Sequence, residues 1–141
     1  MFGKILVGLD GSDASWRAFE KGLALARTAG AELHVITVEE LPARRAEKPD
    51  DLPYEEAHAE ERMSGDFLME ARHRGLAAGV EVYGVGMEGH EVRSILAVAE
   101  RGRFDLLIVG RTGHSKSFPD QAGSTATMLM LRAPCAFLAV P

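Results

Sequence analysis

Residues 106–131 have the sequence LLIVGRTGHSKSFPDQAGSTATMLML, and this stretch decides the fold. Its first four residues are apolar and predict a short buried strand. Gly110 follows at once, Gly113 comes three residues later, and a polar loop then leads to Gly123 and Ser124. The residues after Gly123 have a helical pattern. We therefore expect a strand, a glycine-containing loop and a helix in this order.

The loop and the helix start have the chemistry of an anion site. Glycine lets the backbone approach a ligand closely with its N–H groups turned inward. A helix N-terminus adds unpaired N–H groups with a partial positive charge, and phosphate is the usual anion there. The hydroxyl groups of Ser124 and Thr125 would add donors, and Arg111 and Lys116 would add positive charge. The alternative is that the glycines only form tight turns.

Strand-like and helix-like segments alternate along the whole chain. Apolar stretches predict strands at residues 4–9, 31–38, 80–86, 104–109 and 135–140. Helical periodicity predicts helices from the N-cap Ser12 to Gly30, at residues 52–78, from Gly89 to Gly102, and at residues 123–132. Alternating strands and helices imply right-handed crossovers and a parallel sheet. The predicted fold class is α/β: a single-domain, open five-stranded parallel sheet with helices on both faces and, from the class, strand order 3-2-1-4-5.

In that order, a crevice lies between the first and fourth strands, where open α/β sheets bind ligands. Asp10 follows Leu9 at the end of the first strand and would face Gly110 across this crevice. Its carboxylate would accept hydrogen bonds from ribose hydroxyls or an adenine amine, or help to hold a metal, although Asp is also a common turn residue. Val38 ends the second strand at the same rim. Its backbone would contact an adenine edge, unless the residue is simply part of the core.

The composition bounds the class of protein. A chain of 141 residues, 46% of them hydrophobic, suits one domain, and a net charge of -5 argues against broad nucleic-acid binding. The single cysteine, Cys135, excludes an internal disulfide, and the apolar N-terminal patch is too short for a signal peptide or a membrane span, so we expect a cytoplasmic protein. The histidines show no metal-ligand spacing. Residues 39–51 are charged, contain two prolines and predict an exposed linker.

With these features described, the chain resembles the universal stress protein family over nearly its whole length. The resemblance rests on five stretches: KILVGLDGSD near the start, GHEV before a late helix, FDLLIVGRTG, GSTA and the ending RAPCAFLAVP. The spacing Gly-x2-Gly-x9-Gly-Ser matches the nucleotide-binding pattern of that family, whereas this stretch has neither a Walker A nor a G-x-G-x-x-G pattern. The fold that the resemblance implies is of the adenine nucleotide alpha-hydrolase type.

One branch of the family binds ATP and keeps the loop glycines and the Gly-Ser pair, as this chain does. The resemblance therefore implies ATP, with Mg²⁺ bound through its phosphates. Asp10 and Val38 would meet the adenosine, and Gly110 and Gly113 would approach the ribose and phosphates. Gly123, Ser124 and Thr125 would hold the phosphates, and the expected nucleotide contacts also include Leu9 and Arg111. Family members commonly form homodimers through the last strand, here from Cys135 to Val140. One departure is the polar loop HSKSFPDQA, where the family usually has a leucine-rich stretch.

Three classes of function compete. The first is an ATP-binding regulatory protein, in which ordering of the loop between Gly110 and Gly123 would be the switch. The second is an enzyme that slowly hydrolyses ATP or phosphorylates itself; the loop offers His114, Ser115, Lys116 and Ser117, but no residue is clearly placed as a base. The third is a dimeric interaction module without a nucleotide. A PP-loop pyrophosphatase lacks its glycine pair here, and a receiver domain lacks its acceptor aspartate after the third strand.

Overall fold

The computed structural model describes residues 2–40, 54–113 and 123–141, with side chains described from residue 65 onward in the second range. The elements in these ranges follow in the order β1 (Lys4–Gly8), α1 (Asp13–Ala29), β2 (Glu32–Glu39), α3 (Tyr54–Ala77), β3 (Val82–Glu88), α4 (Glu91–Arg101), β4 (Leu106–Gly110), α5 (Ser124–Arg132) and β5 (Ala136–Val140). The strands form one parallel sheet of order β3-β2-β1-β4-β5, so the predicted fold class and strand order are confirmed. No helix in the described ranges is long and apolar enough to cross a membrane.

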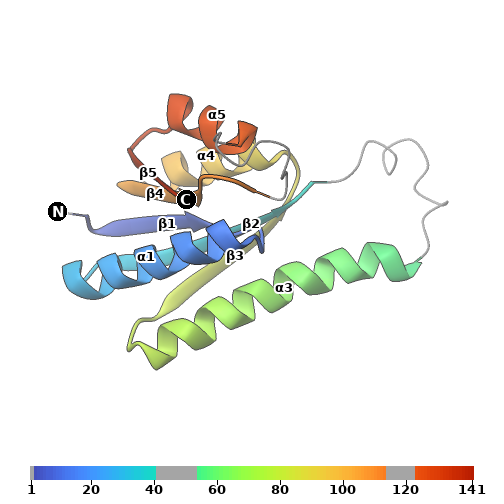
Figure 1. Cartoon of the computed structure of the whole chain (residues 1–141), viewed down its shortest axis with the longest axis horizontal. Coiled ribbons are helices and arrows are strands. Elements are labelled where there is room, and N and C mark those ends of the chain that lie inside the picture. The colour runs from blue at the N-terminus through green and yellow to red at the C-terminus, as the bar shows by residue number, and fades with distance from the viewer. Residues whose placement is uncertain (1, 41–53, 114–122) are drawn as a thin grey trace.

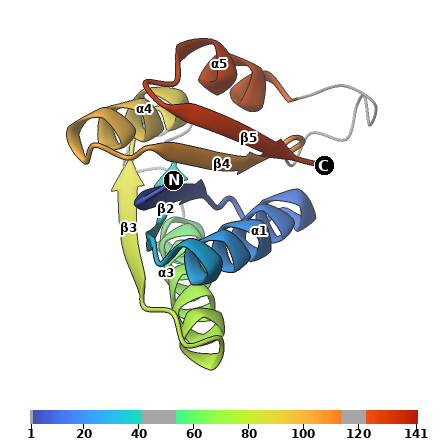
Figure 2. The same cartoon turned by 90° about the vertical axis from the view of Figure 1, so that its left-hand side faces the viewer.

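Helices cover both faces of the sheet: α1 and α3 lie on one face, and α4 and α5 lie on the other (Figures 1 and 2). The central strand β1 contributes side chains to the hydrophobic cores on both faces of the sheet. Ile5 and Val7 pack in the core under α1 and α3, whereas Leu6 packs in the core under α4 and α5. All three side chains are fully buried. A continuous apolar run is expected for a parallel strand covered on both sides. Burial of each such side chain stabilises the fold by about 1.5–3 kcal/mol.

Two predicted strands begin later than expected, because hydrogen-bonded turns hold the residues before them. β4 begins at Leu106 rather than at residue 104, since the Phe104 N–H donates to the Ala99 C=O, at 3.0 Å, in the turn after α4. β3 begins at Val82 rather than at residue 80, since the Val80 N–H donates to the Gly75 C=O at 2.8 Å. Apolar composition predicts where a strand lies in the sequence. The backbone hydrogen bonds of the preceding turn decide at which residue the strand begins to pair with its neighbours.

The first residue of the expected linker, Glu39, belongs to the sheet instead. Glu39 is the last residue of β2 and pairs in register with Glu88 of β3. Its C=O also accepts from the Gly89 N–H at 2.9 Å, and Gly89 has a φ of 136°, which favours glycine. Glu39 therefore belongs to the sheet, and residues 41–51 of the predicted linker lie outside the described residues.

The sequence GVGMEG at residues 84–89 also matches G-x-G-x-x-G, but its first five residues belong to β3 rather than to a loop between a strand and a helix. A β-carbon at Gly84 would lie 3.1 Å from Leu68 Cδ2, so this glycine allows α3 to approach the sheet.

Candidate functional site

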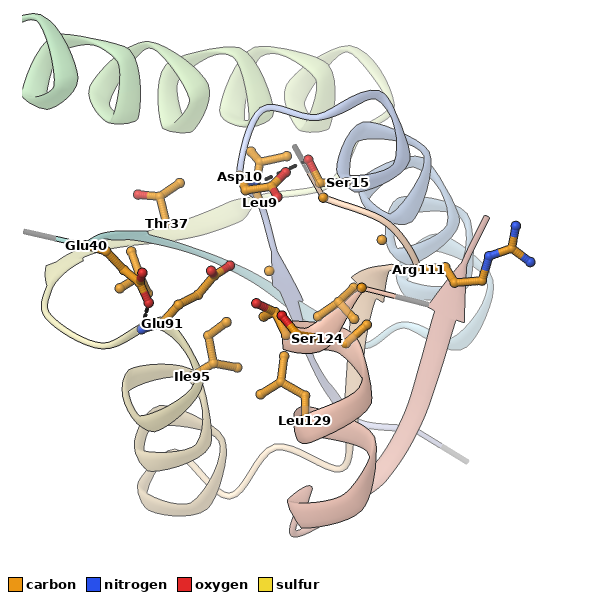
Figure 3. Close-up of a pocket in the computed structure, with 18 of the residues that line it drawn as sticks. Leu9, Asp10, Ser15, Thr37, Glu40, Glu91, Ile95, Arg111, Ser124 and Leu129 are labelled. Carbon is orange, nitrogen blue, oxygen red and sulfur yellow. Dashed lines mark hydrogen bonds between the residues drawn. The ribbon is translucent and has the colours of Figure 1, made fainter. Parts of the chain in front are cut away.

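A cavity of about 440 Å³ opens at the carboxyl ends of the strands, at the point where β1 and β4 lead to opposite halves of the fold. All nine residues that the sequence assigned to a ligand line this cavity: Leu9, Asp10, Val38, Gly110, Arg111, Gly113, Gly123, Ser124 and Thr125. Figure 3 shows how the labelled members surround it. The fold therefore brings together the ends of three strands and the start of α5.

Asp10 forms the β1 wall of the cavity and also stabilises the turn that follows. Its Oδ1 accepts hydrogen bonds from the Ser12 N–H, at 2.9 Å, and from the Ser12 hydroxyl. Ser12 in turn caps α1, because its Oγ accepts from the Ser15 N–H at 3.2 Å. The second carboxylate oxygen faces the opposite wall, since a β-carbon at Gly113 would lie 3.1 Å from Asp10 Oδ2. Asp10 therefore both stabilises the turn after β1 and faces Gly113 across the cavity, as the two sequence interpretations proposed.

The glycines of the β4 wall differ in what they accommodate. A β-carbon at Gly110 would lie only 2.8 Å from Ala14 C and Ser15 N, which belong to the start of α1. Gly110 therefore allows a helix to pack closely against β4. The sequence analysis expected these glycines to let a ligand approach the backbone closely. Gly113 fits this expectation better than Gly110, because the space for its β-carbon faces Asp10 in the cavity.

Among the described residues, the start of α5 has backbone donors without acceptors. Gly123 is the N-cap and has no side chain with which to cap the helix, and the N–H groups of Ser124, Thr125 and Ala126 meet no acceptor among the described residues. The Gly123 N–H donates to the Arg111 C=O at 2.7 Å, so the chain leaving β4 and the chain entering α5 are held together. A helix start with free N–H groups beside a cavity is suited to an anion.

Arg111 lines the cavity, but its side chain does not point into it. Figure 3 shows the guanidinium group directed away from Ser124 and Asp10. The Arg111 N–H donates to the Val140 C=O at 2.7 Å, and the side-chain Nε is buried without a hydrogen-bond partner among the described residues. The backbone of Arg111 therefore contributes to the wall, whereas the positive charge that the sequence suggested lies outside the cavity.

Val38 and Thr37 form the β2 wall. The Leu9 N–H donates to the Ile36 C=O at 2.9 Å, and alternate residues of a strand direct their backbone groups to the same neighbour. Val38 therefore points its N–H and C=O toward the space beyond Leu9, where β1 has ended. Thr37 is only 3% exposed, and its hydroxyl has no partner among the described residues. Buried hydroxyls usually have one.

Sequence reasoning missed the cavity residues that come from α3 and α4. Glu91 and Ile95 of α4 line the cavity one helical turn apart, and Phe67 reaches it from α3. The sequence contained a signal for Glu91, because this residue opens the helix that follows the third strand, and that helix start lies at the same rim as Asp10. It contained none for Phe67, whose position depends on how α3 packs.

Other candidates lie away from the described cavity or outside the described residues. His114, Ser115, Lys116 and Ser117 belong to residues 114–122, which are not described. Cys135 packs beside the core under α4 and α5, and burial raises the pKa of its thiol. A thiol with a raised pKa forms less of the reactive thiolate, so Cys135 fits a structural residue.

Comparison with known proteins gives concordant matches. The model of the universal stress protein family matches residues 1–141. Universal stress protein MJ0531 of Methanocaldococcus jannaschii is 27% identical over 147 residues, which cover 99% of this chain and 82% of that protein. Universal stress protein YxiE of Bacillus subtilis is 26% identical and covers 99% of both chains.

A solved structure, described as a universal stress protein in complex with cAMP, is 25% identical to this chain. The match covers 99% of this chain and 97% of that chain, with a TM-score of 0.76. The family model, the two relatives and the solved structure all match this chain over nearly its whole length. The chain therefore belongs to the universal stress protein family.

Proposed function

We propose that the cavity binds an adenine nucleotide, ATP with Mg²⁺ on its phosphates, and that the chain is a nucleotide-binding regulatory protein. One observation carries the proposal: nine residues chosen from separate segments of the sequence line one cavity. Its volume of about 440 Å³ lies within the range of about 300–1,000 Å³ that is common for small-molecule sites. The relative solved with cAMP supports an adenine nucleotide as the ligand class.

The chemistry of the walls suggests how the nucleotide is oriented. The N–H groups at the start of α5, which meet no acceptor in the described part of the chain, and the hydroxyls of Ser124 and Thr125 suit the phosphates. The backbone of Val38 suits the edge of the base, and the carboxylate of Asp10 suits the ribose hydroxyls, which donate hydrogen bonds. The Mg²⁺ ion would neutralise phosphate charge beside the helix start.

Calorimetric titration of Mg-ATP into the purified chain, freed of carried-over nucleotide, tests the proposal. We expect saturable binding. Gly113→Val should abolish it, because the new side chain would enter the space beside Asp10 Oδ2, 3.1 Å from the β-carbon position. Ser124→Ala should weaken binding by removing one hydroxyl donor.

Gly65→Ala is the matched control, because a β-carbon at this α3 position meets nothing within 4 Å. This variant should bind Mg-ATP like the unaltered chain. Absence of ATP binding in the folded, unaltered chain would refute the nucleotide proposal. The alternative, a dimeric interaction module without a nucleotide, would then take its place.

We also propose that the chain forms a homodimer through β5. This strand is at the edge of the sheet and pairs with β4 only among the described strands. Leu138 on β5 is 38% exposed, and Met130 and Leu131 near the end of α5 are 56% and 70% exposed. An apolar edge strand invites pairing with another chain, and a second copy would cover it.

A further inference from the structure

The cavity has an acidic end away from the start of α5. Glu39 and Glu40, at the end of β2, and Glu91, in the first turn of α4, all line it. Figure 3 shows the Glu91 side chain pointing into the cavity, and the Glu40 side chain turned toward the start of α4. Because the phosphates are proposed to lie at the start of α5, the base of a bound nucleotide would lie at this end.

Glu91 is held in place by the way α4 begins. Glu40 Oε1 accepts a hydrogen bond from the Glu91 N–H at 3.0 Å, and His90 Nδ1 accepts from the Arg93 N–H at 3.3 Å. Ile95, one turn later, is 2% exposed and lines the cavity, so the face of α4 that carries residues 91 and 95 is the cavity face. A position in the first turn also favours a negative charge. The Glu91 carboxylate therefore belongs to a cavity wall whose backbone is fixed by hydrogen bonds at the start of α4.

Thr37 is a second observation at the β2 wall of the same cavity. Its side chain is buried, its hydroxyl lacks a hydrogen-bond partner among the described residues, and the residue lines the cavity. A polar ligand group would satisfy this hydroxyl, which would otherwise stay unpaired. Thr37 thus adds a buried hydroxyl to the β2 wall beside Leu68 of α3, whereas Glu91 comes from α4 on the other face of the sheet.

We propose that Glu91 sets the base specificity of the cavity, by accepting a hydrogen bond from the exocyclic amine of the base. The inference rests on the proposed nucleotide function. Adenine has an amine at C6, whereas hypoxanthine has a carbonyl oxygen there and a proton on N1. A carboxylate attracts the amine and repels the carbonyl oxygen, so Glu91 favours ATP over ITP.

The test measures ATP and ITP affinities by calorimetry for the unaltered chain and for Glu91→Gln. The unaltered chain should bind ATP about 10- to 100-fold more tightly than ITP, the range for a charged hydrogen bond. Glu91→Gln should lose about 10-fold in ATP affinity and bring the two affinities within about threefold, because the amide can present its NH2 group to the carbonyl oxygen. Glu100→Gln, an exposed position of the same helix outside the cavity, should keep the original ratio.

Each other result has a definite meaning. Equal affinity of the unaltered chain for ATP and ITP would overturn the inference and leave the nucleotide proposal intact. An equal loss for both nucleotides in Glu91→Gln would also overturn it, because Glu91 would then act on the ribose or only on the start of α4. Should Glu91→Gln unfold, Glu91→Asp keeps the charge at the helix start and should still reduce the preference for ATP. Absence of ATP binding to the unaltered chain would refute both proposals before any variant is compared.

Discussion

At the scale of single residues, Gly110 shows that a glycine in a binding pattern can serve packing. The missing β-carbon faces the backbone of α1, at 2.8 Å from Ala14 C and Ser15 N, rather than the cavity. Backbone atoms cannot move aside as the end of a flexible side chain can. The same residue therefore belongs to the cavity wall and to the joint between β4 and α1.

The first prediction is that Gly110→Ala destabilises the fold even without a ligand. Relief of a contact with the α1 backbone requires a shift of the helix or the strand, and overpacking of this kind costs about 1–3 kcal/mol. Gly65→Ala, in open space on α3, should instead stabilise the fold by about 0.5–1 kcal/mol. Urea unfolding of both variants measures the difference. A Gly110→Ala chain as stable as the unaltered one would show that the packing is less tight than described.

The second prediction concerns Thr37. Thr37→Val replaces a buried hydroxyl, which has no partner among the described residues, with a methyl group of similar size, so the free energy of unfolding should be unchanged or higher by about 1 kcal/mol. The control is Thr127→Val, because the Thr127 hydroxyl donates to the Gly123 C=O at 3.0 Å and its loss should lower stability by about 0.5–1.5 kcal/mol. Denaturant midpoints compare the two. A marked loss in Thr37→Val would mean that the hydroxyl has a partner in solution.

At the scale of elements, the loop before β4 holds the start of β1. Asp105 accepts from the Gly3 N–H at 2.8 Å and from the Lys4 N–H at 3.1 Å. Lys4 Nζ donates to the Gly102 C=O at 2.7 Å and lies 4.7 Å from the centre of the Phe104 ring. The hydrogen bond from Gly3 is the largest cause of a lowered pKa of the Asp105 carboxyl. These contacts align β1 with β4 at the end of the sheet opposite the cavity.

The third prediction is that Asp105→Asn lowers stability at neutral pH and that the difference disappears in acid. Because the folded-state pKa of Asp105 is lowered from 3.8, the ionised carboxylate stabilises the fold above that value, and this contribution is lost as the pH falls through the folded-state pKa. Urea midpoints at pH 7 and at several acidic values measure the effect, with Asp66→Asn on the exposed side of α3 as the control. A difference that persists at the lowest pH would point to altered packing.

At the scale of the whole molecule, the sheet has two edge strands, β3 and β5. The β5 edge carries the exposed Leu138, and the exposed Leu131 belongs to α5, the helix that precedes β5 in the chain. Tyr83 on the β3 edge stacks on His34 with ring centres 4.8 Å apart. The exposed apolar side chains near β5 support this edge as the proposed surface between two copies.

The fourth prediction is that the unaltered chain sediments as a dimer and that Leu138→Lys is a monomer. A lysine on an edge strand opposes pairing with a second strand, because burial of its charge is costly. Leu76→Lys, at a position 71% exposed on α3, changes charge equally and should remain dimeric. Analytical ultracentrifugation measures the mass of each. A dimeric Leu138→Lys chain would exclude β5 as the contact.

Much of the architecture could be predicted, because the signals for it are local. Continuous apolar runs identified β1 and β4, and Ser12 identified the start of α1 through its cap. The nine proposed contacts converge because strand order places the ends of β1, β2 and β4 at one rim. The direction of the Arg111 side chain, and the position of Phe67 in the cavity wall, depend on packing between segments that are distant in the sequence. The sequence has no local signal for such packing.

The sequence by itself determined the family and the alternation of strands and helices, because periodicity, caps and glycine spacing act over a few residues. The strand order, and with it the segments that meet at the rim, was expected from the fold class and is established by the tertiary structure. Only the tertiary structure decided that Gly110 accommodates α1, that the Arg111 charge points away from the cavity, and that Glu91 points into it. The physical reason is that a side chain's direction and a glycine's necessity are set by close packing against elements distant in the chain.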